Sequence, residues 1–196
     1  MFRIICVTDR KLCSGDFFAR LAEICAGGAD FVILREKDLA AAEYAEVAGR
    51  ALAICGPRLV LHGAAALPLL RRVPRVHLPL AVLESKPEIR KNAELLGVSV
   101  HSAEEAKRAQ KLGADYVTAG HIFETACKSG LPGRGLSFLR DTASSVNIPV
   151  YAIGGVSARN IAAVRGAGGA GACVMSGLMS CASPKDTLAE LRRAAG

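Results

Sequence analysis

The stretch Phe31-Val32-Ile33-Leu34-Arg35-Glu36-Lys37 joins a short, continuously apolar run to three charged residues. Four apolar residues in succession suit a strand of a parallel sheet that is covered on both faces better than a half-exposed antiparallel strand. A second run of this kind is Ala172-Cys173-Val174-Met175, which Ser176 and Gly177 follow. The pattern indicates a parallel sheet with polar or small residues where its strands end.

Short apolar runs alternate with amphipathic stretches along the whole chain. Strands are expected to begin near Arg3, Asp30, Arg58, Arg75, Leu96, Ala114, Ile148 and Ala172. Parallel pairing requires crossovers, which are expected as helices over 16–25, 40–55, 64–70, 86–95, 103–112, 137–145, 158–167 and 184–195. Eight strand–helix units in 196 residues predict a (β/α)₈ TIM barrel, an α/β fold, as a single domain over residues 1–196.

Length and composition support one compact domain, because 51% of the 196 residues are hydrophobic and 22% are charged. The apolar N-terminal segment turns polar at Thr8, too early for a signal peptide or a membrane span, so we expect a soluble cytoplasmic protein with no membrane partner. The seven cysteines are scattered without a Cys-x-x-Cys pair, which does not indicate zinc or a redox dithiol. Cys127 is interpreted as a bystander thiol.

The net charge of +7 raises the question of a nucleic-acid partner. The basic residues cluster on or beside predicted helices, for example at Arg71 and Arg72, without interleaved aromatic residues. Aromatic residues make up only 5% of the chain, and tryptophan is absent. The clusters are interpreted as solvated helix faces, and no nucleic acid is expected to bind.

The carboxyl ends of the eight strands would surround one mouth of a barrel, where active sites of this fold are built. His121 follows the predicted strand that begins near Ala114, and its side chain can titrate near neutral pH. It is therefore the candidate proton-transfer residue. His62 and His101 also follow strands and are expected to line the pocket, whereas His77 lies within a strand and is expected to pack in the barrel. Their spacing predicts no metal site.

Two loops and one charged segment are candidates for binding an anion. Gly154-Gly155 and Ser176-Gly177 follow the last two strands, where barrels of this kind commonly hold phosphate on backbone N–H groups. Arg35 and Lys37 would project to the same side of an extended segment. These features predict a small phosphorylated substrate with a second anionic group.

Seven motifs along the chain resemble the family of thiamine phosphate synthase and thiazole tautomerase. They are Leu34-Arg35-Glu36-Lys37, Ser99-Val100-His101-Ser102, Gly120-His121-Ile122-Phe123-Glu124-Thr125, Lys128-Ser129-Gly130, Gly133-Arg134-Gly135, Ala152-Ile153-Gly154-Gly155 and Val174-Met175-Ser176-Gly177. The resemblance runs from the first strand to the last. It implies a (β/α)₈ barrel that handles a thiazole phosphate, with Ser99, Thr125 and Lys128 among the substrate-binding residues.

The two branches of this family differ at identifiable positions. The resemblance implies that a synthase holds Mg²⁺ with acidic residues after strands three and four, and here His62-Gly63 and the segment 79–82 (Pro-Leu-Ala-Val) stand there. The pattern Gly-His-x-Phe-Glu-Thr at 120–125 is that of the tautomerase. The resemblance therefore implies an isomerase of thiamine biosynthesis, with His121 as the catalytic residue and with no cofactor or metal.

Two alternatives stay open. Lys37 and Lys128 fit the pattern of a thiamine phosphate synthase, in which such cations hold pyrophosphate. The other alternative is a non-catalytic barrel that binds thiazole phosphate and serves regulation. A homo-oligomer is also left open, because the sequence does not specify the oligomeric state.

Overall fold

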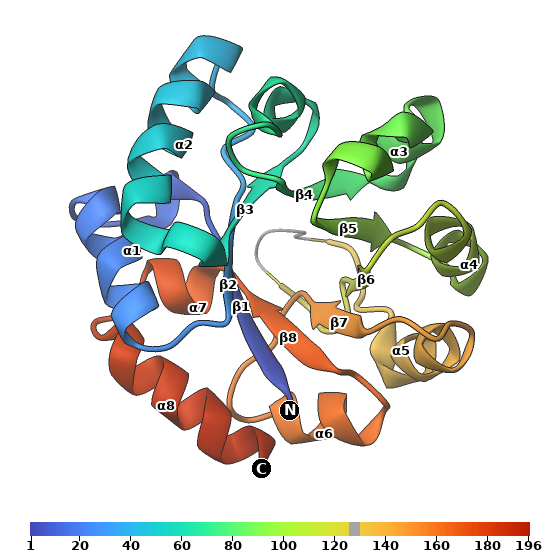
Figure 1. Ribbon diagram of the computed structural model, residues 1–196. Coiled ribbons are helices and arrows are strands. Elements are labelled where there is room, and N and C mark those ends of the chain that lie inside the picture. Colours follow the sequence, from blue (N-terminus) through green and yellow to red (C-terminus); the bar gives the residue numbers. More distant parts are fainter. Residues whose placement is uncertain (126–129) are drawn as a thin grey trace.

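The computed structural model describes residues 1–125 and 130–196. Eight parallel strands form a closed barrel in the order of the sequence, and β8 pairs with β1. The strands are β1 (Arg3–Val7), β2 (Phe31–Leu34), β3 (Leu59–His62), β4 (Arg75–Pro79), β5 (Leu95–Val100), β6 (Tyr116–Gly120), β7 (Val150–Ile153) and β8 (Gly171–Val174). This arrangement confirms the predicted (β/α)₈ barrel, and Figure 1 shows the helices around the strands.

The α-helices lie outside the barrel. They are α1 (Phe17–Ala26), α2 (Ala41–Cys55), α3 (Leu80–Ser85), α4 (Ala103–Lys111), α5 (Gly135–Ser144), α6 (Ile161–Gly166), α7 (Ser176–Met179) and α8 (Pro184–Ala195). Asp16, Ser102 and Ser183 cap α1, α4 and α8 by accepting a backbone hydrogen bond from the first turn. Within the described residues, no helix is both long enough and apolar enough to cross a membrane.

Three connections differ from the expected helices. The crossover after β3 is the 3-10 helix η3 (Ala64–Leu69), because in an α-helix the ring of Pro68 would clash with the carbonyl group four residues earlier. The helix expected over 86–95 is absent: the α-helix of this connection, α3, lies before that range, and within the range the chain forms the 3-10 helix η4 (Pro87–Asn92). Pro87 holds Lys86 out of the helical conformation, so α3 ends before it. The short helix α7 was not predicted.

The apolar residues form two layers, as a covered parallel sheet requires. Ile33 packs inside the barrel, whereas Val32 and Leu34 pack in the larger cluster between the barrel and the helices. The interior cluster consists of Ile5, Val7, Ile33, Val60, Tyr116, Tyr151 and Cys173. The apolar run of β2 is therefore buried on both faces, as the sequence predicts.

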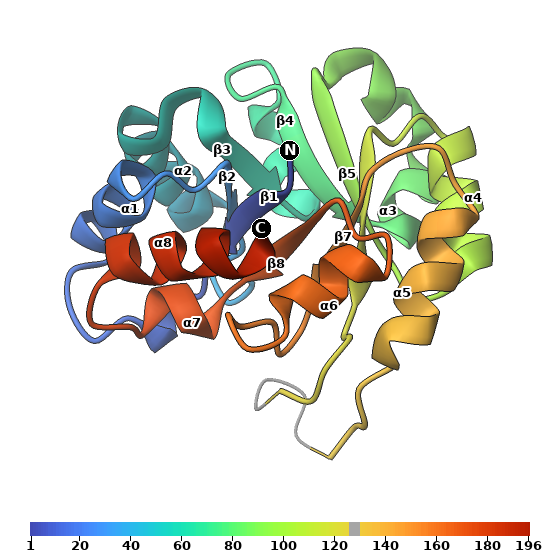
Figure 2. The same ribbon diagram turned by 90° about the horizontal axis from the view of Figure 1, so that it is seen from below.

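The parallel strands all end at the same side of the barrel. Figure 2 shows α7, the described segment that follows β6 and the described segment that precedes α5 on this side. The residues that follow the strands are thus brought together, although they lie far apart in the sequence.

Candidate active site

One pocket of about 240 Å³ lies at this end of the barrel, and residues of all eight strands or of the connections after them line it. The predicted site residues found in its lining are Arg35, His62, Ser99, His101, His121, Thr125, Gly154, Gly155, Ser176 and Gly177. Sequence reasoning did not single out a further set of lining residues, which includes Val7, Ile33, Thr118, Ile153, Cys173 and Met175. These side chains come from the barrel interior. Their place in the pocket lining therefore depends on the register of the strands.

Two predicted substrate-binding residues are not found in the described lining. Lys37 does not line the pocket, although its charge acts on the imidazole of His62. Lys128 lies outside the described residues, as does Cys127. The cation that reaches the pocket from the segment after β2 is Arg35.

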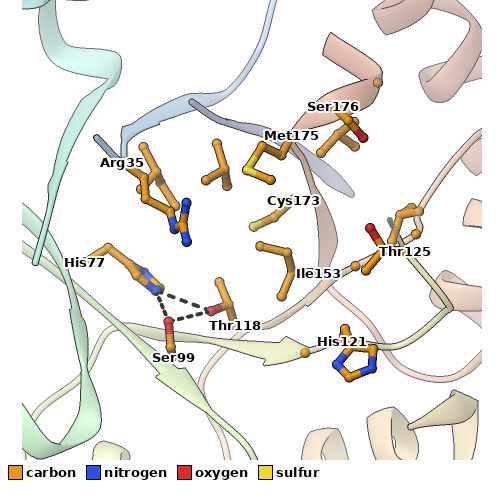
Figure 3. A pocket seen from close by; sticks show the side chains of 18 of the residues that line it. Arg35, His77, Ser99, Thr118, His121, Thr125, Ile153, Cys173, Met175 and Ser176 are labelled. Carbon is orange, nitrogen blue, oxygen red and sulfur yellow. Dashed lines mark hydrogen bonds between the residues drawn. The ribbon is translucent and has the colours of Figure 1, made fainter. Parts of the chain in front are cut away.

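His121 lies at the edge of the pocket directly after β6, and 7% of its surface is exposed (Figure 3). Its Nε2 atom lies 2.9 Å from the carbonyl oxygen of Pro132. A carbonyl only accepts hydrogen bonds, so Nε2 carries the hydrogen and Nδ1 of the neutral ring keeps its lone pair. Among the described residues, this buried Nδ1 has no partner. An unpaired buried acceptor costs about 1–3 kcal/mol, and a hydrogen-bond donor that reached this atom would remove that cost.

Gly154 packs directly against His121. Its φ angle is +98°, and a Cβ atom at this position would overlap the Cβ atom of His121 and lie 2.8 Å from its Cα atom. The chains after β6 and β7 are also joined by hydrogen bonds from Ile122 N–H to Ile153 O (2.9 Å) and from Phe123 N–H to Gly154 O (3.0 Å). A glycine at 154 is therefore needed for this placement of the imidazole.

Arg35 is held by a buried network that joins the ends of β1 and β2. The Thr8 hydroxyl donates to the Glu36 carboxylate (2.6 Å) and accepts from the Arg35 N–H (3.0 Å). The same carboxylate accepts from the backbone N–H of Arg10. Glu36 is thus a buried structural carboxylate that fixes the backbone on which Arg35 enters the pocket.

His62 is fixed by Tyr44 of α2, for which the sequence offered no local signal. The Tyr44 hydroxyl donates to the Leu34 carbonyl (2.9 Å) and accepts from the His62 N–H (2.9 Å). Burial, together with the charges of Arg35 and Lys37, lowers the pKa of His62 to about 4. His62 is therefore a neutral wall of the pocket at pH 7, not a cation that binds an anion.

The side of the pocket opposite Arg35 offers backbone N–H groups as hydrogen-bond donors. Among the described residues, none accepts a hydrogen bond from the backbone N–H groups of Gly155, Ser176 or Gly177. These groups lie after β7 and β8, as predicted, and all three residues line the pocket. They are available to the oxygens of a phosphate.

His77 is buried, as predicted, but it also forms part of the pocket floor. Its Nε2 atom lies 2.8 Å from the Ser99 hydroxyl oxygen, and the Thr118 hydroxyl oxygen lies near both. Burial is the main reason that the pKa of His77 falls to about 3, with a smaller contribution from His62. The floor is therefore polar and uncharged.

The charges of the lining indicate which ligands fit. Among the described residues that line the pocket, none is an aspartate or a glutamate. No group of three or more His, Cys, Asp or Glu residues in the described parts of the chain is placed to hold a metal ion. Mg²⁺ is usually bound through one or two carboxylates, substrate phosphates and waters, so the described lining residues, which offer no carboxylate, do not fit a magnesium site.

Comparison with known proteins identifies the family. Residues 4–178 match the family described as thiamine monophosphate synthase. The chain is 34% identical to the thiamine-phosphate synthase of Fusobacterium nucleatum, with 91% of this chain and 89% of that protein covered. The thiamine-phosphate synthase of Syntrophomonas wolfei is 30% identical, with 98% and 95% covered.

A solved structure agrees with these relatives. The thiamine phosphate pyrophosphorylase from Pyrococcus furiosus superposes with a TM-score of 0.81 at 29% identity, covering 99% of this chain and 95% of that one. The match extends over the barrel and over every connection that carries a described pocket residue up to Gly177. The chain therefore belongs to the thiamine monophosphate synthase family.

Proposed function

We propose that this protein is a thiazole tautomerase within its family. The substrate would be a 2-carboxy-thiazolinylidene ethyl phosphate, and the product its aromatic isomer, 2-(2-carboxy-4-methylthiazol-5-yl)ethyl phosphate. The observation that carries the proposal is a pocket that combines the His121 imidazole with anion-binding groups and has no carboxylate among its described lining residues. Such a pocket suits proton transfer in an anionic substrate without a metal ion.

The two kinds of anion-binding group lie on different sides of the pocket. Figure 3 shows Arg35 near His77 on one side and Ser176 and Thr125 on the other, with Ile153 and Cys173 between them. In the proposed complex, the phosphate binds the N–H groups near Gly155, Ser176 and Gly177, and the carboxylate faces Arg35. The apolar side chains between them would contact the thiazole ring.

His121 would move the proton. The C2–H bond of the substrate breaks as Nδ1 takes the proton, the electron pair shifts through the ring, and the exocyclic carbon takes a proton back from the imidazolium. The hydrogen bond from Nε2–H to Pro132 keeps the acceptor at Nδ1. Because Nδ1 is covered in this conformation, contact with the substrate requires a small shift of the ring or of the side chains around it.

A thiamine phosphate synthase is the second candidate, and the names of the relatives favour it. That reaction would join a pyrimidine pyrophosphate to thiazole phosphate with Mg²⁺ held by acidic residues after β3 and β4. His62-Gly63 and Pro79-Leu80 occupy these positions, and they offer the metal no carboxylate. The described residues of the pocket therefore do not fit Mg²⁺.

The test of the proposal is turnover of the 2-carboxy-thiazolinylidene ethyl phosphate, called the dihydro substrate below, by purified protein. The absorbance of the aromatic product is followed, and the uncatalysed rate is subtracted. A tautomerase is expected to turn the substrate over at about 1 per second or more. A rate no higher than the uncatalysed one would refute the proposal and leave the synthase or a non-catalytic regulator.

The phosphate position predicts the effect of a negative charge at Ser176. Ser176→Asp is expected to weaken binding of the aromatic thiazole carboxylate phosphate by about tenfold or more, since two like charges would meet in the pocket. Ser176 is better suited than Gly155, whose φ of +67° and contact with Phe123 would strain any side chain. Isothermal titration calorimetry measures the affinity.

Ser180→Asp is the matched control for this variant. Ser180 is also exposed and directly follows α7, but it is not among the residues that line the pocket. The control is expected to bind the ligand about as tightly as the native protein. Equal affinities of the two variants would place the phosphate elsewhere.

A further inference from the structure

His77, Gly97 and Tyr116 lie side by side on three neighbouring strands. The register pairs His77 of β4 with Gly97 of β5, and Gly97 with Tyr116 of β6. A Cβ atom at Gly97 would overlap the phenol of Tyr116 and lie 2.5 Å from Nδ1 of His77. The two rings therefore meet inside the barrel across a position that must be glycine.

The contact between the rings is a buried hydrogen bond. The Tyr116 hydroxyl oxygen lies 3.1 Å from Nδ1 of His77, and the residues are 2% and 3% exposed. On the other edge of the imidazole, Nε2 lies 2.8 Å from the Ser99 hydroxyl oxygen and 3.3 Å from that of Thr118. A hydrogen-bond chain thus leads from the barrel interior to the pocket, and Figure 3 shows its pocket end.

The hydrogens of this chain have one favourable arrangement. Among the described residues, the Tyr116 hydroxyl has no hydrogen-bond partner other than Nδ1 of His77, so it must donate to this atom or remain an unpaired buried donor. Burial raises the pKa of Tyr116 well above its usual value and lowers that of His77 to about 3, so both are neutral at pH 7. A neutral imidazole that accepts at Nδ1 carries its hydrogen on Nε2.

We infer that Tyr116 and His77 are positioning residues that make the Ser99 hydroxyl a hydrogen-bond donor directed at the ligand. The Nε2–H of His77 occupies a lone pair of the Ser99 oxygen, so Ser99 cannot donate back to the imidazole. The Thr118 oxygen, at 3.4 Å, is a poor alternative acceptor. The Ser99 hydrogen is therefore left for a group in the pocket.

This inference rests on the proposed function for the identity of the ligand group. The group that faces Ser99 must accept a hydrogen bond, because the floor offers it a donor. Figure 3 shows Arg35 on the same side of the pocket as His77 and Ser99. A carboxylate only accepts hydrogen bonds, and Arg35 and Ser99 together would hold the substrate carboxylate.

Tyr116→Phe tests the positioning role without touching the ligand. In the native protein, ¹⁵N NMR is expected to find Nδ1 of His77 unprotonated and Nε2 protonated, whereas the variant should populate the other tautomer. Its affinity for the aromatic thiazole carboxylate phosphate should fall roughly 3- to 10-fold. Tyr151→Phe is the matched control, since its buried ring lies 5.2 Å from that of Tyr116 and does not line the pocket. It should leave the tautomer and the affinity unchanged.

Ser99→Ala provides a second, independent measurement. It should weaken binding of the carboxylated ligand by about 10- to 100-fold and binding of the decarboxylated thiazole phosphate far less. In the Ser99→Ala background, Tyr116→Phe should cost no further affinity, because it acts through Ser99. The inferred role of Tyr116 and His77 is wrong if native His77 carries its hydrogen on Nδ1, or if the losses of affinity in Tyr116→Phe and Ser99→Ala are additive in the double variant. Neither measurement uses turnover. A failure of this inference can therefore be told apart from an absence of tautomerase activity.

Discussion

His121→Gln is expected to lower the single-turnover rate of aromatisation by about 10²- to 10⁴-fold, the usual range for loss of a general acid–base group. A glutamine side chain can keep a hydrogen bond to the Pro132 carbonyl, but it has no nitrogen that accepts a proton near neutral pH. Binding of the aromatic product should change little. The rate is measured on the dihydro substrate, with the uncatalysed reaction subtracted.

His101→Gln is the control for this variant because His101 also lines the pocket after a strand. Its Nδ1 atom lies 3.3 Å from the Gly120 carbonyl oxygen, so this histidine too is oriented by the backbone beside His121. Its loss is expected to cost less than the loss of His121. If His121→Gln reacts at the native rate, another group moves the proton, and His101 or the Cys127 thiol would be tested next.

Gly154→Ala is expected to lower the same rate by about 100-fold, although residue 154 carries no reacting group. The new Cβ atom would overlap that of His121, and alanine disfavours the φ angle of +98°. The imidazole must then move, and a displacement of about 1 Å at a reacting group can cost about 10²-fold in rate. The rate and the thermal midpoint of unfolding are measured together.

Gly166→Ala separates this effect from a general loss of stability. Gly166 ends α6 and has no positive φ, and a methyl group added there would meet no atom within 4 Å. Alanine at this position should leave the rate unchanged and preserve or raise the thermal midpoint. A Gly154→Ala protein that is folded and fully active would mean that the position of His121 against β7 does not matter for the reaction.

The sequence was sufficient to predict the barrel because each strand has its own local signal. The apolar run of β2 and the capped helix α8 both lie within about a residue of their expected bounds. The expected helix over 86–95 was wrong because the apolar segment after Pro79 forms α3 instead, and Pro87 at the start of the expected range separates α3 from the 3-10 helix η4. Local patterns thus located most elements and failed where a proline determines the boundary.

The candidate site was only partly predictable for a different reason. His121 and Gly154 follow strands and could be recognised by position, since all strand ends meet at one side of a barrel. The roles of Tyr44 and Tyr116 depend on which residues of other strands they reach. Sequence spacing does not specify such contacts, which arise only from the register of the closed sheet.

Assignment to the tautomerase branch is tested most directly by giving one protein preparation the substrates of both candidate reactions. One sample receives the dihydro thiazole carboxylate phosphate, and the other receives pyrimidine pyrophosphate, thiazole phosphate and Mg²⁺. We predict aromatisation well above the uncatalysed rate and no formation of thiamine phosphate. Formation of thiamine phosphate at about 1 per second or more, with aromatisation no faster than in buffer, would contradict this assignment and place the protein in the synthase branch.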